Sequence, residues 1–141
     1  MDLLIKNIQH YITLSSRDEE IIRKLFHERK LKKGEHLLEA GNICKYITFI
    51  QEGLVRYYFS NDGEEQISYF NKEEEFVCDY QSFLPQTPSR INIQALEDTT
   101  IYIISYADMQ LLYKQVEHGE RFGRLGIEEV FINVTAQVNS L

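Results

Sequence analysis

The sequence predicts a mostly β protein with flanking helices, an α+β domain built around a β roll. Its 141 residues are 43% hydrophobic and 26% charged, which suits one folded domain with a buried core. Between Lys30 and Ile104, short runs rich in Ile, Val, Tyr, Phe and Thr are separated by Gly, Asn or Asp about every ten residues. On both sides of that stretch, apolar residues recur at helical spacing.

Two helices are predicted before the β region. The first covers Asp2 to about Tyr11, and the second begins at the Ser15-Ser16 pair. Ser16 and Glu19 have the spacing of a capping box, in which each side chain hydrogen-bonds to the other residue's backbone amide. The apolar stripe of the second helix consists of Ile21, Ile22, Leu25 and Phe26.

The turn Asn61-Asp62-Gly63 predicts a hairpin, because these residues tolerate the positive φ angles of tight turns. Its strands are expected over Val55 to Phe59 and Gln66 to Phe70. Further turns are expected at Gly34, Gly41 and Gly53.

The second half of the β region is less regular. Phe76 to Phe83 follows a polar stretch and fits a single helical turn, and Pro85 and Pro88 mark a loop. Two strands are then expected, joined by a turn at Glu97-Asp98. In the first, Ile91, Ile93 and Ala95 alternate with Asn92 and Gln94, and the second covers Thr99 to Ile104.

The C-terminal part is predicted to be helical. Ser105 and Asp108 have capping-box spacing and begin a short helix that continues through Tyr113, and Gly119 separates it from a final helix. Apolar residues on that helix recur at steps of four and three, which is the seam of a coiled coil. They are Ile127, Phe131, Val134, Val138 and Leu141.

Two interpretations of this seam stay open. It packs on the protein's own β roll, or it packs on a second copy of the chain and makes a homodimer. A narrow seam that continues to the last residue favours the homodimer, since an exposed apolar seam needs a partner.

Composition restricts partners and location. A net charge of -7 opposes binding to phosphate backbones, so these 141 residues should not bind DNA themselves. The basic residues Arg29, Lys30, Lys32 and Lys33 alternate around Leu31, which favours the solvent face of a strand. No apolar run predicts a membrane span or signal peptide, and two cysteines, expected as small core residues, suit a cytoplasmic protein.

No catalytic, metal or cofactor site can be assembled from the sequence, so no enzyme is predicted. The four histidines form no HxH or HxxxH pair, which a metal enzyme of the cupin type, the least favoured alternative, would need. The acidic runs Glu73 to Glu75 and Glu64-Glu65 are interpreted as solvated loop charge. Nucleotide-binding glycine loops are also missing from the sequence.

Several segments in order resemble the β roll of the cyclic-nucleotide-binding domain in Crp/Fnr-type bacterial transcription regulators. They are LKKGEHLLEAG (31–41), ITFIQEGLVRYYF (47–59), DGEEQISYF (62–70), EEEFVCDYQSF (73–83) and ALED (95–98). The resemblance covers the chain from Leu25 onward and implies a jelly roll, or double-stranded β-helix, followed by a dimerisation helix.

This resemblance implies two parts. Residues 1–118 would be a sensing domain for an unknown small-molecule effector, and residues 119–141 a dimerisation helix that leads to a DNA-binding helix-turn-helix domain. Because no residues remain for that domain, DNA would be contacted only through a part outside this sequence. The alternative is a stand-alone regulatory or protein-interaction module.

The family's phosphate cassette places Gly-Glu at the start of a short helix and Arg-Ser or Arg-Thr about ten residues later, where backbone amides and the guanidinium hold the cyclic phosphate. Without a gap, these four positions carry Cys78, Asp79, Ser89 and Arg90. A one-residue shift would restore an arginine but would bury Asn92 and Gln94. The gapless register therefore predicts a cassette that does not bind cyclic AMP. The expected ligand-binding residues are Phe70, Phe76, Val77, Cys78, Asp79, Tyr80, Ser89 and Arg90.

Overall fold

The computed structural model describes residues 1–139, which group into two compact units. One unit contains His27–Tyr106, and the other combines Met1–Phe26 with the segment from Ala107 onward. The N-terminal helices thus associate with the C-terminal helices. The functional division between residues 118 and 119 stays a prediction.

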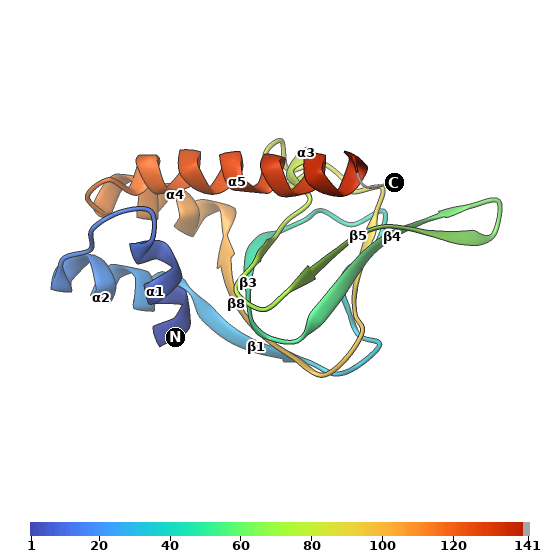
Figure 1. Ribbon diagram of the computed structural model, residues 1–141, viewed down its shortest axis with the longest axis horizontal. Coiled ribbons are helices and arrows are strands. Elements are labelled where there is room, and N and C mark those ends of the chain that lie inside the picture. Colours follow the sequence, from blue (N-terminus) through green and yellow to red (C-terminus); the bar gives the residue numbers. More distant parts are fainter. Residues whose placement is uncertain (140–141) are drawn as a thin grey trace. The chain divides into compact units, whose positions relative to one another are not determined.

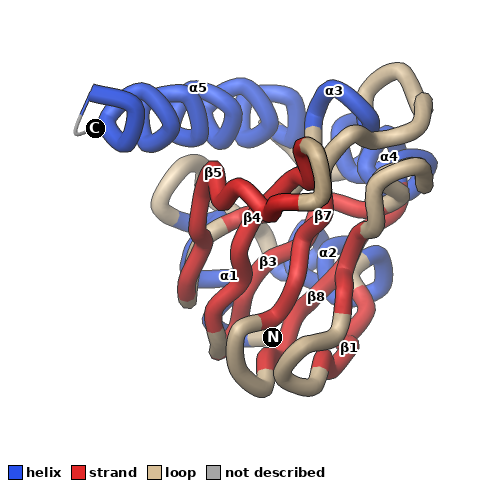
Figure 2. The backbone as a smooth tube through the Cα atoms, turned by 90° about the vertical axis from the view of Figure 1, so that its right-hand side faces the viewer, coloured by secondary structure: helices blue, strands red, loops and turns tan. Residues whose placement is uncertain are grey.

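The first unit is a jelly roll of two four-stranded antiparallel sheets, which confirms the predicted fold class (Figure 2). One sheet has the order β1-β8-β3-β6, and the other has the order β2-β7-β4-β5. The strands are β1 His27–Leu31, β2 His36–Leu38, β3 Tyr46–Glu52, β4 Leu54–Asn61, β5 Glu64–Lys72, β6 Phe76–Val77, β7 Asn92–Ala95 and β8 Thr99–Ser105, with the short helix α3 Tyr80–Phe83 between β6 and β7.

The roll is held together by side chains that both sheets bury between them. Alternation along each strand places one set of residues in the interior, and burying each large apolar side chain stabilises the fold by roughly 1.5–3 kcal/mol. The most deeply buried of these residues include Ile50, Val55, Ile93 and Ile101.

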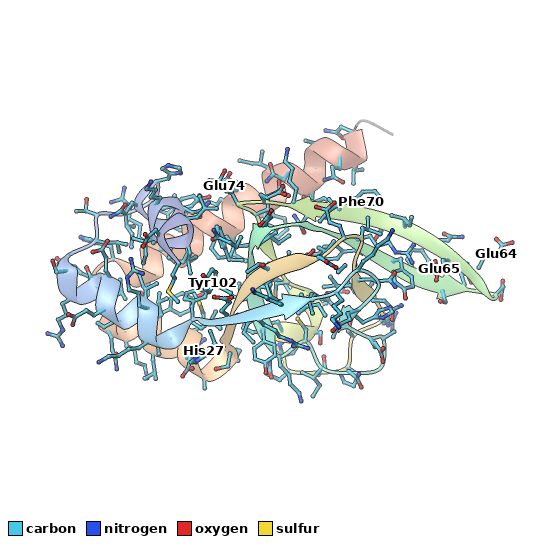
Figure 3. The ribbon with its side chains drawn as sticks, turned by 90° about the horizontal axis from the view of Figure 1, so that it is seen from below. His27, Glu64, Glu65, Phe70, Glu74 and Tyr102 are labelled. Atoms are coloured by element: carbon cyan, nitrogen blue, oxygen red, sulfur yellow. The ribbon has the colours of Figure 1, made fainter. Side chains whose placement is uncertain are left out.

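The β4–β5 hairpin forms where the Asn-Asp-Gly sequence predicts it. Asp62 and Gly63 have φ angles of 52° and 81°, so both central residues are left-handed, as a tight two-residue hairpin requires. The hairpin extends well beyond the rest of its sheet (Figure 1), and Glu64 and Glu65 lie near its tip (Figure 3). Its strand β5 is an edge strand.

Three details differ from the sequence predictions. β1 begins at His27 and buries only Leu31, so the basic run spans the end of a strand and the following turn. β2 was not predicted, because a three-residue strand shows no periodicity. The segment expected as a single helical turn, 76–83, contains β6 as well as α3.

The helices of the second unit are α1 Asp2–Gln9, α2 Ser16–Leu25, α4 Tyr106–Gln115 and α5 Gly119–Asn139, although Tyr106, the first residue of α4, groups with the roll. The capping box of α2 lies one residue earlier than predicted. Ser15 is the N-cap, its Oγ accepts a hydrogen bond from the Asp18 amide at 3.0 Å, and Asp18 Oδ2 accepts one from the Ser15 amide at 3.0 Å. Both Ser15 and Ser16 can cap a helix, so their sequence alone leaves the first residue ambiguous.

Contacts between helices hold this unit together. The Glu117 amide donates to Asp18 Oδ1 at 3.2 Å, the rings of Tyr11 and Phe122 lie 5.8 Å apart, and the Tyr11 hydroxyl donates to Glu129. At Gly119 a Cβ atom would lie 2.6 Å from the Leu112 carbonyl oxygen. Glycine is therefore required for α4 and α5 to meet at this distance.

Candidate functional site

The candidate site is the segment of residues 78–90 between β6 and β7, called here the cassette segment. Its central interaction joins two positions ten residues apart: Ser89 Oγ donates a hydrogen bond to Asp79 Oδ2 at 2.6 Å. Asp79 is the N-cap residue of α3, and Ser89 is 5% exposed. A buried hydroxyl thus contacts a carboxylate where the family resemblance implies an arginine and a glutamate.

The backbone of Ser89 is fixed by the loop between β2 and β3. The Gly41 amide donates to the Ser89 carbonyl and the Ser89 amide donates to the Asn42 carbonyl, each at 2.8 Å. Ser89 Oγ also accepts from the Ile91 amide at 3.0 Å. These bonds hold the hydroxyl towards Asp79.

The first amide of the cassette segment is already occupied. The Cys78 amide donates to the Tyr57 hydroxyl at 3.1 Å, and Tyr57 is 8% exposed. Burial raises the pKa of Tyr57 well above its usual value, so the hydroxyl stays neutral near neutral pH. This amide therefore has an internal partner in place of a phosphate oxygen.

The Cys44 thiol lies beside the cassette segment and lines one small cavity with Cys78. Its pKa is lowered, first by a hydrogen bond from the Cys78 thiol and then, against the effect of burial, by hydrogen bonds with the backbone of Asp79 and Tyr46. The Cys44 thiol donates a hydrogen bond to the Tyr46 carbonyl at 3.5 Å. Cys44 is a core residue, as predicted, but its contact with Cys78 was not foreseen.

The space beside these thiols is small. A cavity of about 10 Å³ is lined by both cysteines and by Thr48, which is room for about one water-sized molecule. An open groove of about 690 Å³ adjoins it, because Leu37, Leu38, Lys45 and Tyr46 line both. In this conformation the cavity has no room for a nucleotide.

The structure brings together only part of the predicted set. Ser89 hydrogen-bonds to Asp79, and Cys78 directly precedes Asp79 at the start of the cassette segment. Val77 is buried in the roll, Phe76 packs on Phe49 with ring centroids 5.2 Å apart, and Tyr80 opens α3 half-buried.

Two predicted residues lie apart from that group. Arg90 is exposed, and Phe70 is 43% exposed on β5, away from the tip that carries Glu64 (Figure 3). Whether any of the eight residues contacts a ligand stays a prediction.

The strand after the cassette segment, β7, shows the predicted alternation. Ile93 and Ala95 are each 1% exposed, whereas Asn92 and Gln94 are half-buried. Asn92 Oδ1 accepts from the Ala40 amide at 2.9 Å, so this side chain lies at the sheet surface. A shifted register would bury these amides.

Residues that sequence reasoning missed reach the site from distant strands. Tyr57 comes from β4, Cys44 precedes β3, and Ser82 Oγ in α3 accepts from the Cys44 amide at 2.7 Å. Nothing in the local sequence marks these residues, because each has the character of an ordinary strand or loop residue.

The acidic run after β5 is more than solvated charge. Glu73 Oε1 accepts from the Gly53 amide at 3.1 Å, and backbone hydrogen bonds lower the pKa of Glu73. Glu75 Oε1 accepts from the Lys72 amide at 2.9 Å. The prediction is therefore incomplete: these exposed or half-buried carboxylates also fix turns.

The predicted seam on α5 is mostly exposed. Phe131, Val134 and Val138 are 66%, 38% and 60% exposed, Ile127 is partly buried, and Leu141 lies outside the described residues. Within residues 1–139, no group of three or more His, Cys, Asp or Glu could hold a metal ion. None of the helices described here has the length and apolar character needed to cross a bilayer.

Solved structures share this fold. The sensor domain of the transcriptional regulator DNR from Pseudomonas aeruginosa matches with a TM-score of 0.73 at 13% identity, covering 99% of this chain and 91% of that one. The Thermus thermophilus catabolite activator protein gives 0.72 at 15% identity, covering 94% and 60%. A CooA mutant from Carboxydothermus hydrogenoformans gives 0.69 at 19% identity, covering 89% and 80%. No curated protein sequence matches.

The jelly roll with a short helix and loop inserted between β6 and β7 has the architecture of a cyclic-nucleotide-binding-type domain. The family model described as the cyclic nucleotide-binding domain matches residues 28–116, well over half of the chain. The chain therefore belongs to the cyclic nucleotide-binding domain family.

Proposed function

We propose that this chain is the effector-sensing and dimerisation part of a Crp/Fnr-type transcription regulator, and that cyclic AMP is not its effector. The shared fold with the catabolite activator protein, CooA and the DNR sensor domain supports the first half. The role is binding rather than catalysis. DNA would be contacted through a domain outside this sequence.

The observation that argues against cyclic AMP as the effector is the Ser89–Asp79 hydrogen bond. A cyclic phosphate is an anion, and the family holds it with a guanidinium. Here the corresponding position carries a neutral hydroxyl that is already bonded to a carboxylate. A phosphate placed there would meet the negative charge of Asp79 with no compensating cation from Ser89.

The free energy of the lost hydrogen bond indicates how much weaker the binding of cyclic AMP should be. A hydrogen bond to a charged group contributes roughly 1.5–3 kcal/mol, so losing one weakens binding about ten- to a hundredfold. The Cys78 amide is also bonded to Tyr57 and would have to exchange partners. These two effects act in the same direction.

Isothermal titration calorimetry with cyclic AMP and cyclic GMP tests this proposal. The chain is expected to show no low-micromolar binding of either nucleotide. Low-micromolar affinity for one of them would contradict it.

A gain-of-function variant makes the test two-sided. Cys78→Gly, Asp79→Glu, Ser89→Arg and Arg90→Ser together restore the family pattern, and cyclic AMP affinity should rise about ten- to a hundredfold for each charged hydrogen bond regained. The matched control is Arg90→Ser alone, which removes an exposed charge without adding the guanidinium. Equal affinities for the two variants would argue against the assigned register.

Signalling in this proposal passes to α5. A ligand shifts a conformational equilibrium only if it binds one state better than another. The effector would therefore bias the arrangement of α5 in a homodimer. The exposed apolar residues of α5 also favour a second candidate, a regulatory module that binds another protein.

A further inference from the structure

The open groove of about 690 Å³ is a second place on the roll where a small molecule could bind. Its volume lies in the range of roughly 300–1,000 Å³ that is usual for small-molecule sites. The lining comes from Arg29 of β1, from β2 and the loop after it, and from Tyr46 of β3. Pro88 is its one lining residue from the cassette segment, so the groove is distinct from the Ser89–Asp79 contact.

Arg29 lies on the inner face of its sheet, although it is exposed. It pairs with Ile101 on β8, and Ile101 pairs with Ile50 on β3. Cross-strand partners point to the same face of a sheet, and both isoleucines are fully buried. Because β1 is an edge strand, its guanidinium lies where the interior of the roll meets solvent.

The same face carries a buried hydroxyl that has no partner. Tyr46, Thr48 and Ile50 alternate along β3, and Thr48 lines the cavity of about 10 Å³ to which Tyr46 and the groove are joined. Thr48 is 1% exposed, and its Oγ1 has no hydrogen-bond partner among the described residues. A buried polar atom without a partner destabilises the fold, so an oxygen atom placed in this cavity would be bound favourably.

The groove has an excess of positive charge, whereas the whole chain has a net charge of -7. Arg29 and Lys45 are exposed, and neither forms an ion pair within residues 1–139. Glu39 is the acidic residue of the lining, and its Oε1 lies 3.8 Å from His36 Nδ1. A carboxylate group in the groove would therefore find two cations that are not already paired.

Much of the remaining lining is apolar. Leu37, Ile43 and Tyr46 are half-buried there, and Pro88 is exposed. β8 lies between β1 and β3, so Arg29 and Thr48 belong to strands about 10 Å apart. A ligand that contacts both residues needs an anionic group at one end, a hydroxyl at the other and a flat apolar body between them.

We propose that the groove binds an aromatic hydroxy acid. Its carboxylate binds Arg29 and Lys45, and its ring packs on Tyr46 and its apolar neighbours. Its hydroxyl enters the small cavity and hydrogen-bonds to Thr48, since that cavity has room for one oxygen atom. A guanidinium and a carboxylate form strong, charge-assisted hydrogen bonds, so the anionic end should contribute most of the affinity. Only the description of this ligand as the effector rests on the proposed function.

Three related compounds test the chemistry in isothermal titration calorimetry with the 141-residue chain. The acid 4-hydroxyphenylacetate should bind. Phenylacetate lacks the hydroxyl and should bind roughly two- to tenfold more weakly, and 2-(4-hydroxyphenyl)ethanol lacks the charge and should bind roughly ten- to a hundredfold more weakly. Equal affinities for the three compounds, or no binding of the hydroxy acid in the millimolar range, would overturn the proposal.

Variants locate the two ends of the ligand. Arg29→Gln should weaken binding of 4-hydroxyphenylacetate roughly tenfold or more, whereas Lys30→Gln, the same change of charge on the opposite face of β1, should leave it unchanged. In Thr48→Val, which removes an unpaired hydroxyl and should fold normally, 4-hydroxyphenylacetate and phenylacetate should bind equally. Equal effects of the two charge variants, or an undiminished preference for the hydroxy acid in Thr48→Val, would overturn the assigned contacts.

These titrations are independent of the titration with cyclic nucleotides. Tight binding of cyclic AMP would contradict the proposed function and leave the groove site standing. Failure of the hydroxy acid to bind would remove the groove site and leave the interpretation of Ser89 and Asp79 unaffected.

Discussion

Gly53 joins β3 to β4 at a point where a side chain does not fit. Its φ angle is 131°, and a Cβ atom there would lie 2.3 Å from Thr99 Oγ1. Thr99 is 2% exposed, and its hydroxyl donates to the Glu97 carbonyl at 2.8 Å. Moving the Thr99 side chain aside would therefore cost free energy. The close approach of the two sheets at this corner depends on the missing side chain.

We predict that Gly53→Ala destabilises the chain much more than Gly63→Ala. Both residues have positive φ, which costs an alanine about 1–2 kcal/mol, but only Gly53 adds overpacking of about 1–3 kcal/mol. Urea unfolding of the two variants measures the difference. Equal midpoints would show that Thr99 accommodates the methyl group.

At the scale of elements, the stability that Asp18 contributes at the start of α2 depends on pH. Burial alone would raise the pKa of Asp18, but hydrogen bonds from the Ser15 and Glu117 backbone outweigh it and lower the pKa below 3.8. A carboxylate whose pKa is lower in the folded state than in the unfolded state stabilises the fold fully at pH values above its unfolded-state pKa. That contribution is lost as the pH falls through the folded pKa.

Asp18→Asn is therefore expected to reduce stability by roughly 1.5–3 kcal/mol at neutral pH, the usual contribution of hydrogen bonds to a charged group. The difference from wild type should shrink as the pH falls below 3.8. Chemical unfolding across this range measures it, with Asp62→Asn in the exposed hairpin turn as the control. A difference that stays constant with pH would contradict the assigned role of the carboxylate.

The exposed face of α5 is the second element with a testable consequence. Phe131 and Val138 lie on the seam, whereas Ala136 lies on the opposite side of the helix. We predict a homodimer, which Phe131→Glu with Val138→Glu converts to a monomer and Ala136→Glu leaves intact. Light scattering after size exclusion should give twice the 16.7 kDa chain mass for the wild type. A monomeric wild type at micromolar concentration would contradict the seam.

At the scale of the whole molecule, strands with clear local signals could be predicted from sequence. The Asn-Asp-Gly turn marks the hairpin, and alternation marks β7. β2 and β6 have three and two residues, too few to show a period of two. They are strands because their neighbours offer hydrogen-bonding partners.

The candidate site was less predictable than the fold. The residues that the gapless register assigns to the cassette, Cys78, Asp79 and Ser89, lie in the segment between β6 and β7. The partners of these residues depend on topology, since Tyr57 and Cys44 reach them from other strands. A sequence read along its length contains no signal for contacts that only the closed roll creates.

The edge position of β5 has a consequence for solubility. Within residues 1–139, β5 is paired only with β4, so its outer side leaves amides and carbonyls open, beside Ile67 and Phe70. Such an edge can recruit a strand from another molecule and start aggregation, which natural proteins oppose with charged side chains. Glu64 and Lys72 provide that protection at the two ends of the strand. Resistance to fibre-like association thus depends on a few hairpin charges.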